Sequence, residues 1–396
     1  MHLPSERIYK EMRSEEVGTW IVPANGGKET ALLIKAPTNA LKAIVSGAKM
    51  SMVYAFQESY LCSAIRVYDV PEEPLLLCNI QRHEEEHCAL RKVASVGKTP
   101  IFLFNELDVC VAWSDGILSE GDRIGLNEFL SKHPIPYSGE YSAEAIKALD
   151  NFCSITNQMT EVLASDVMAI IETPIQYGKW VSNMVSFAGN NDLQTIVLDD
   201  RDEGGVLEKS IWASLESVFP FGLHKSPQVK IGKKQRELID VVAFYQYGSF
   251  FIEAKDLSVF AAGLDRTRER RVLGVQKQAE KAIGQLVGAS KTAKRGVEAF
   301  NAKGSQIPLV LDKPLHCIVL LTELIHEGDW TEVEDAIRSA AMETGDYFHV
   351  FDLRELVMLL KCSSGQAHRL DYNLMKRFER FVEAGTIHIR SRPAPK

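Results

Sequence analysis

The sequence predicts an α/β protein of two domains, and three observations lead to this fold class. The chain has 396 residues, which is more than one ordinary hydrophobic core accommodates. From about residue 186 onward, helical patterns alternate with short apolar strands, as in a central sheet covered by helices. The residues before that point are richer in strands. We therefore expect an N-terminal α+β domain at 1–185 and an α/β domain at 186–396.

In the N-terminal domain, strand patterns dominate up to residue 113. The apolar runs that predict strands are ALLIKA, SMVYAF, LCSAIRVYDV, PLLLCNI, IFLF and VCVAW. A polar helix is expected at 82–95, and the tight turn NELD separates the last two strands. Helical spacing continues over 141–172, as one helix or as two.

In the C-terminal domain, helices and strands follow one another in a legible order. Helices are expected at 203–218, 265–302, 332–343, LRELVMLL and 371–384. Strands are expected near 226–231, in the hairpin ELIDVVAFYQYGSFFIEAKD, and in LHCIVLL and YFHVF.

The composition excludes a membrane span. The chain is 45% hydrophobic and 25% charged, and no stretch approaches about 18 uninterrupted apolar residues. Residues 1–16 are charged throughout and lack the apolar core of a secretory signal. The seven cysteines are scattered and never form C-x-x-C, which is typical of reduced thiols. We expect a cytoplasmic protein that does not associate with membranes.

The hairpin carries three ionisable groups inside apolar strands. If its turn is centred on Gln246 and Tyr247, Asp240 lies opposite Glu253, with side chains ~5 Å apart. Lys255 is two residues beyond Glu253 and projects from the same face. The neighbouring residues are apolar on both faces, which indicates central strands. Burying charge there costs several kcal/mol per group unless it is paired or holds a metal.

A divalent cation would explain this arrangement. Two bare carboxylates at this separation repel each other, whereas Mg²⁺ prefers one or two carboxylates, waters and phosphate oxygens; Mn²⁺ is the alternative ion. Such an ion can activate water and neutralise charge on a phosphodiester. Lys255 would orient or help to deprotonate that water and stabilise the developing charge. The structural alternative is an ion pair at a sheet edge, which explains the apolar neighbours poorly.

Asp240, followed after twelve residues by Glu253-Ala254-Lys255, resembles the D…(D/E)-x-K motif of the restriction-endonuclease-like PD-(D/E)XK nuclease superfamily. The Mrr-like and nuclease-related branches are the most similar, and the resemblance covers roughly 190–396. It implies a mixed central sheet flanked by helices, and a Mg²⁺-dependent endo- or exonuclease that prefers DNA. The Pro that often precedes the first Asp of the motif is replaced by Ile239.

The same resemblance implies two further site residues. Members of the superfamily often have a glutamate on the helix before the hairpin, and Glu208 lies one turn before the apolar Ile211. The alternative role of Glu208 is to offset the helix macrodipole. Several members place a glutamine on the helix after the hairpin. Gln278 is the candidate, and Gln276 is equally near.

Basic side chains flank the hairpin on both sides. Residues 261–303 contain ten basic and four acidic groups, a local charge of +6 in a chain of −8. A second basic group directly precedes the hairpin. The side chains expected to contact phosphates are Lys233, Lys234, Arg236, Arg268, Arg270, Arg271 and Lys277. No base-reading motif is evident, so binding to nucleic acid, with DNA preferred, should have weak sequence specificity. A solvated helix face is the structural alternative.

The pentapeptide HEEEH offers a competing metal site. His83 and His87 match the H-E-x-x-H pattern of zinc peptidases, and Glu106 stands at a spacing used for a third ligand. The surrounding helix is mostly polar, and Glu106 falls in the NELD turn, so we expect an exposed amphipathic helix instead. A structural zinc would draw on Cys78, His83, His87 or Cys88.

Three function classes follow from these patterns. The first is a metal-dependent nuclease, which the resemblance associates with restriction, anti-phage defence or repair. The second is a degenerate nuclease fold that only binds nucleic acid or a protein. The third is a zinc metallopeptidase that uses HEEEH. By analogy, the N-terminal domain would sense, recruit or dimerise, giving a homodimer or a complex with a partner protein.

Overall fold

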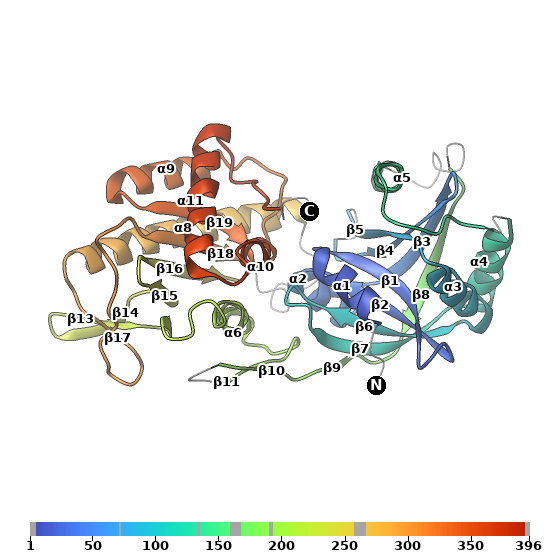
Figure 1. Cartoon of the computed structure of the whole chain (residues 1–396), viewed down its shortest axis with the longest axis horizontal. Helices are drawn as coiled ribbons and strands as arrows, with labels where there is room; N and C mark the ends of the chain where they lie inside the picture. Colours follow the sequence, from blue (N-terminus) through green and yellow to red (C-terminus); the bar gives the residue numbers. More distant parts are fainter. Residues whose placement is uncertain are drawn as a thin grey trace. The chain divides into compact units, whose positions relative to one another are not determined.

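The computed structural model describes residues 5–70, 73–132, 135–158, 168–189, 193–256 and 267–392. The chain divides into two compact units: Met1–Asn183, and Met184–Ala261 together with Arg266–Lys396. Each unit has its own sheets and helices (Figure 1). The division after Asn183 lies two residues before the boundary at 185 that the sequence suggests.

The first unit is built on one mixed sheet. In the described residues its strands follow the order β1-β2-β6-β7-β8-β3-β4-β5, and β9 pairs with β7. β2 and β6 are parallel, whereas the remaining pairs are antiparallel. The strands are β1 (Gly18–Ala24), β2 (Glu29–Lys35), β3 (Met50–Gln57), β4 (Tyr60–Val67), β5 (Leu75–Gln81), β6 (Lys98–Phe104), β7 (Cys110–Ile117), β8 (Ile170–Tyr177) and β9 (Val181–Ser182).

Helices of the first unit bury apolar side chains against this sheet. They are α1 (Glu6–Ser14), α2 (Thr38–Val45), α3 (Glu84–Val96), α4 (Glu120–Lys132) and α5 (Ala143–Gln158). Ala148 and Phe152 of α5 pack on β3, β4 and β5. Ala89, Leu90 and Val93 of α3 are buried, as its apolar spacing predicted, and Glu86, His87 and Ala94 are buried as well.

The helical pattern predicted over 141–172 is wrong at its end. Helix α5 ends at Gln158, and strand β8 begins at Ile170. In β8, Thr173 and Ile175 are buried while Glu172, Pro174 and Gln176 are exposed or partly exposed. This two-residue alternation is that of a half-buried strand, so the helical spacing of 143–152 does not extend this far.

The second unit has a five-stranded mixed sheet between two helical layers. In the described residues the strand order is β12-β15-β16-β18-β19. β12, β15 and β16 pair antiparallel, and β18 and β19 run parallel to β16. The strands are β12 (Leu223–Lys225), β15 (Val241–Tyr245), β16 (Gly248–Lys255), β18 (His316–Leu321) and β19 (Tyr347–Asp352).

The two faces of this sheet are covered by different helices (Figure 1). Val241 and Ile252 belong to the core with α6 (Glu203–Leu215) and α10 (Leu353–Cys362). Val242 and Phe251 belong to the core with α8 (Arg268–Lys294) and α9 (Thr331–Thr344). α11 (Ala367–Ala384) contributes to both cores. β15 and β16 are therefore central strands buried on both faces, which explains their continuous apolar sequence.

Smaller ribbons complete the second unit. β10 (Val185–Ala188) pairs with β11 (Leu193–Ile196), and β13 (Gln228–Ile231) pairs with β14 (Lys234–Glu237) and β17 (Ala299–Phe300). β17 lies within the helix expected at 265–302. Helix α8 ends earlier because Gly296 adopts a left-handed φ of +79° just after it. No helix in the described ranges is long and apolar enough to cross a membrane.

Candidate active site

The hairpin has the register that the sequence predicts. Val241 pairs with Ile252, and Tyr245 pairs with Gly248, so only two residues form the turn. Extending this register by one residue places Asp240, which directly precedes β15, opposite Glu253 of β16. Both residues lie near the carboxyl ends of the parallel strands β16 and β18, which are central in the sheet.

In the structure, Asp240, Glu253 and Lys255 lie close together: Asp240 binds the backbone between the other two residues, and Lys255 forms an ion pair with Glu253. Asp240 Oδ2 accepts a hydrogen bond of 2.8 Å from the backbone N–H of Ala254. The backbone of Asp240 opposes the rise in the pKa of Glu253. Lys255 Nζ lies 2.5 Å from Glu253 Oε1. The Glu253 side chain is 2% exposed and that of Lys255 is 16% exposed, so this ion pair is largely removed from water.

Burial makes the two carboxylates hard to ionise together. It raises the pKa of Asp240 to about 7, and the nearby charge of Glu253 acts in the same direction. Burial also raises the pKa of Glu253, against the opposing effect of Lys255. Two carboxylates in this position titrate as a pair, and a divalent cation between them would favour the doubly ionised state.

Glu208 lies near this pair but binds another partner. It is half-buried on α6, and its Oε2 is 3.0 Å from Lys225 Nζ of β12. Its charge raises the pKa of Asp240. The carboxylates of Asp240, Glu253 and Glu208 do not all come within 4.8 Å of one another. Of the three carboxylates predicted as metal ligands, Asp240 and Glu253 therefore lie together, and Glu208 stands beside them.

Two charged residues near the site were not anticipated. Glu237 of β14 raises the pKa of Glu253 through its charge. Lys225 holds Glu208, and it pairs across the sheet with Val241, next to Asp240. Glu237 belongs to the ELID stretch and could have been found there. The position of Lys225 depends on the register between β12 and β15, which no local pattern reveals.

Neither glutamine candidate reaches the carboxylates. Gln278 is exposed on α8 and makes no hydrogen bond to Asp240, Glu253 or Lys255 within the described ranges. Gln276 is buried, and its Nε2 donates to the carbonyl of Asp329 at 2.8 Å. Gln276 therefore fixes the loop before α9.

The predicted phosphate contacts fall into two groups. Lys233 of the β13–β14 turn, and Lys234 and Arg236 of β14, are exposed and form no ion pair among the described residues. Arg270 and Lys277 are exposed on α8.

The other two arginines of α8 are paired. Arg268 forms an ion pair with Glu327, and Arg271 Nη2 lies 2.7 Å from Glu323 Oε2. Both acids come from the segment that links β18 to α9. The basic character of this end of α8 is therefore partly neutralised.

The β13–β14 ribbon continues directly from the strands that carry the site. Ser226 N donates to Asp240 O at 2.7 Å, and Leu238 N donates to Pro227 O at 2.8 Å. These bonds connect the β12–β15 pair to the β13–β14 pair. The basic turn and Asp240 therefore belong to one long, interrupted hairpin.

The HEEEH motif does not form the zinc site of a peptidase. His83 precedes α3, so the two histidines do not share a helical face. His87 Nε2 donates to the carbonyl of Gln81 at 2.9 Å. Glu106 accepts hydrogen bonds from Thr38 N and Thr38 Oγ1, at 2.7 and 2.6 Å, at the start of α2. Each proposed ligand thus has a separate structural partner.

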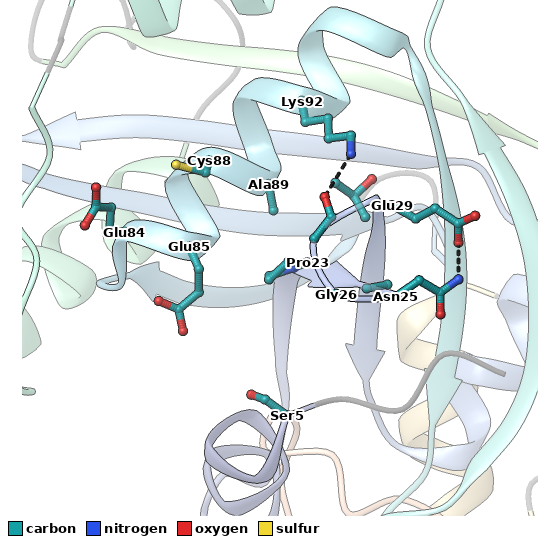
Figure 2. Close-up of a pocket in the computed structure, with 13 residues that line it drawn as sticks. Ser5, Pro23, Asn25, Gly26, Glu29, Glu84, Glu85, Cys88, Ala89 and Lys92 are labelled. Atoms are coloured by element: carbon teal, nitrogen blue, oxygen red, sulfur yellow. Dashed lines mark hydrogen bonds between the residues drawn. The ribbon is translucent and has the colours of Figure 1, made fainter.

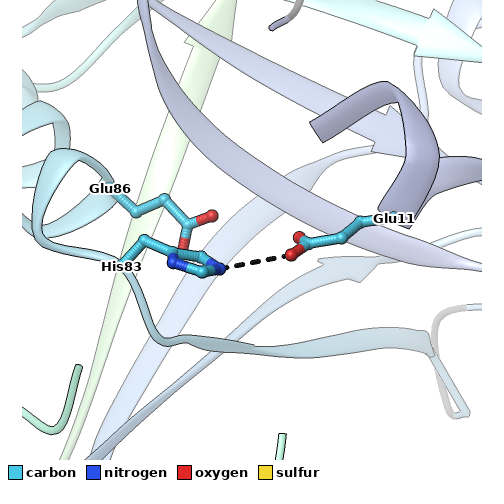
Figure 3. Close-up of side chains that lie close together, drawn as sticks. All are labelled: Glu11, His83 and Glu86. Atoms are coloured by element: carbon cyan, nitrogen blue, oxygen red, sulfur yellow. Dashed lines mark hydrogen bonds and ion pairs between the residues drawn. The ribbon is translucent and has the colours of Figure 1, made fainter. Parts of the chain in front are cut away.

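A different acidic cluster surrounds His83. Ligand atoms of Glu11, His83 and Glu86 lie within 4.8 Å of one another, and His83 Nε2 is 3.2 Å from Glu11 Oε1 (Figure 3). Arg82 and Arg7 bind Glu11 at 2.5 and 3.1 Å, and Arg7 also reaches Glu86 at 3.3 Å. Two guanidinium groups thus pair with these carboxylates, yet burial still raises the pKa of Glu86 to about 7, and the cluster ties α1 to α3.

The cysteines proposed for a structural zinc lie elsewhere. No group of metal-binding side chains in the described ranges combines Cys78 or Cys88 with His83 or His87. Cys88 instead lines an open pocket of about 740 Å³ between α3 and the β1–β2 turn (Figure 2). Lys92 closes one side of this pocket by donating to Gly27 O at 3.0 Å.

Comparisons with protein-family models, with characterised proteins and with solved structures find no match to this chain. A functional assignment therefore depends on the residues and the geometry described above.

Proposed function

We propose that the chain is a metal-dependent nuclease that hydrolyses phosphodiester bonds, with DNA as its preferred substrate. One observation carries the proposal: Asp240, Glu253 and Lys255 lie together at the ends of two central strands, where burial opposes ionisation of the two carboxylates. Raised pKa values of buried acidic groups are typical of functional sites. The D…E-x-K pattern and the exposed basic turn at 233–236 support the same reading.

The side chains present fit a hard divalent cation such as Mg²⁺ or Mn²⁺. Asp240 Oδ1 accepts no hydrogen bond from the described residues, and Glu253 offers a second carboxylate beside it. Two carboxylates suffice for Mg²⁺, which retains waters and binds phosphate oxygens. Glu208 would become a third acidic group if Lys225 released it. A cation held here supplies positive charge to the phosphodiester and lowers the pKa of water.

The chain's own residues then have distinct tasks. The N–H of Ala254 fixes the orientation of Asp240, so this carboxylate does not have to reorganise during the reaction. Lys255 can transfer its contact from Glu253 to a phosphate oxygen, where its ammonium stabilises the charge that develops in the transition state. Lys233, Lys234 and Arg236 hold the backbone of the nucleic acid without reading its sequence.

The proposal is tested by incubating the purified protein with plasmid DNA and with single-stranded RNA, in Mg²⁺ and in EDTA. We expect cleavage of DNA in Mg²⁺ only, and its loss in Asp240→Asn and Glu253→Gln. Asp312→Asn, at an exposed carboxylate just before β18, should retain full activity. Wild-type activity in both site variants would contradict the assignment. Binding without cleavage in Mg²⁺ and in Mn²⁺ would identify a binding module instead.

A further inference from the structure

We propose that a groove beside this site binds a single-stranded segment of DNA, with one base stacked on Phe221. The inference rests on the proposed nuclease function and names the form of substrate that reaches the carboxylates. It assigns a role to side chains that the D…E-x-K pattern does not include.

The groove has a volume of about 400 Å³ and is formed within the second unit. One wall is the end of α6 with the turn that follows it, and the others are β12 and the loop at 301–303. Trp212, which lines the groove, is 6% exposed, whereas Phe221 is 81% exposed. The groove thus presents an exposed aromatic side chain to solvent.

The turn that presents Phe221 is firmly anchored. Gly222 O accepts a hydrogen bond of 2.8 Å from Phe244 N of β15, and Gly222 N donates to Phe219 O at 3.2 Å. A Cβ atom at Gly222 would lie 2.0 Å from Phe244 O, so only glycine permits this approach. Phe219 is buried against Phe250, with ring centroids 5.0 Å apart. The exposure of Phe221 is therefore set by a fixed backbone, not by a loose loop.

The charges along the groove suit a phosphate backbone that leads to the site. Lys303 is exposed and forms no ion pair within the described ranges, and Lys225 lines the groove while contacting Glu208. Lys225, which lines the groove, pairs with Val241, the residue that follows Asp240 in the chain. Glu216 is the carboxylate among the lining side chains, on the α6 wall. A phosphate that binds Lys225 would also release Glu208 toward the other two carboxylates.

A single strand is the occupant that these features favour. In a duplex, both faces of each base are covered by neighbouring bases, whereas an unpaired base can stack on an exposed aromatic ring. A lone exposed aromatic side chain is ordinary on a protein surface. Phe221 differs because it lines a groove with two lysines, one of which pairs with the residue next to Asp240. Stacking of this kind tolerates any base, which agrees with the absence of a base-reading motif.

The test compares binding of one fluorescent oligodeoxynucleotide, single-stranded and as a duplex, with Ca²⁺ replacing Mg²⁺ to hold the uncut complex. We expect Phe221→Ala to weaken single-strand binding about tenfold and duplex binding less than about twofold. Phe221→Trp should restore single-strand binding. Met342→Ala, at a side chain on α9 that is 80% exposed, is the matched control and should bind as the wild type does. Lys303→Ala should reduce the salt dependence by roughly one phosphate contact.

The outcomes separate this inference from the nuclease proposal. If the wild type cleaves DNA but Phe221→Ala binds and cleaves single strands normally, the groove assignment is wrong and the nuclease proposal stands. If single-strand binding depends on Phe221 but no cleavage occurs in Mg²⁺ or Mn²⁺, the groove stands and the nuclease proposal fails. Equal weakening of single-strand and duplex binding, or no single-strand binding by the wild type, overturns the inference. A thermal unfolding curve for Phe221→Ala that matches the wild type excludes misfolding.

Discussion

Asp352 and Asp240, two residues of the second unit, show two ways of burying a carboxylate. Burial alone would raise the pKa of Asp352, yet Arg354 and Arg390 hold it well below its usual value. Arg390 binds both of its oxygens, at 2.6 and 2.8 Å, and Asp352 also caps α10. Asp240 forms no ion pair with an arginine of the described residues, and its pKa is raised. Asp352 is thus a satisfied structural group, whereas the charge of Asp240 is poorly balanced by its described neighbours.

The raised pKa of Asp240, about 7, gives the metal-free protein a distinctive pH dependence. An unfolded aspartate ionises near about 3.9, so between these values the folded protein binds more protons than the unfolded one. Stability from this group is therefore present at low pH and is lost as pH rises through about 7. We expect the Tm in EDTA to fall between pH 5 and pH 8 more steeply for the wild type than for Asp240→Asn. Equal slopes in thermal unfolding curves would show that Asp240 is not the group responsible.

We expect Lys255 to affect the rate of cleavage and not the affinity for DNA. Its charge is needed only as charge develops on the attacked phosphate, so its loss should spare ground-state binding. We expect Lys255→Met, which retains the apolar stem, to lower the cleavage rate by about 10²-fold or more. The affinity for labelled DNA in Ca²⁺ should stay within about twofold. A loss of affinity that matches the loss of rate would make Lys255 a binding residue instead.

At the scale of elements, the two basic segments should contribute unequally to binding. The turn residues Lys233, Lys234 and Arg236 form no ion pair among the described residues, whereas Arg268 and Arg271 of α8 pair with glutamates. Replacing the three turn residues by Gln should therefore reduce the salt slope of DNA binding by up to roughly three. The double change Arg268→Gln with Arg271→Gln should reduce it by clearly less than roughly two. Titrations at several salt concentrations measure both slopes, and a larger effect from α8 would reverse this ranking.

Elements whose pattern is local were predictable from the sequence. A two-residue turn between apolar runs fixed the pairing of Asp240 with Glu253, and the bounds of α9 and β19 differ by one residue from those expected. Features that depend on distant segments were not. The contact of Lys225 with Glu208, and the exposure of Phe221, arise from how α6, β12 and β15 pack together.

The HEEEH motif also shows that a local pattern does not reveal contacts with distant segments. Its spacing predicted a shared helical face only if both histidines were helical. The helix begins at Glu84, and His83 is drawn to Glu11 of a helix more than seventy residues earlier. A motif of five residues cannot specify such a contact, because the competing partner is absent from the local sequence.

At the scale of the whole molecule, the two units have separate cores, so substitutions in the first unit should not affect the candidate site in the second. We expect His83→Ala combined with His87→Ala to leave cleavage of DNA unchanged, because both histidines belong to the first unit. The double variant should lose some stability in thermal unfolding, since His87 is buried and hydrogen-bonded. His83→Ala alone is the milder control. Zinc content should be far below one ion per chain, and stoichiometric zinc that disappears in the double variant would establish a metal site in the first unit.

The pairing of β16 with β18 also sets the point during synthesis at which the candidate site can form, because β18 is made after β16. Glu253 lies beside Val319, and Lys255 beside Leu321, which the ribosome adds sixty-six residues later. At 5–20 residues per second, this interval lasts roughly 3–13 s. A nascent chain released before β18 would carry the D…E-x-K residues on a hairpin that lacks its parallel neighbour. The candidate site would therefore be complete only in chains that extend past β18.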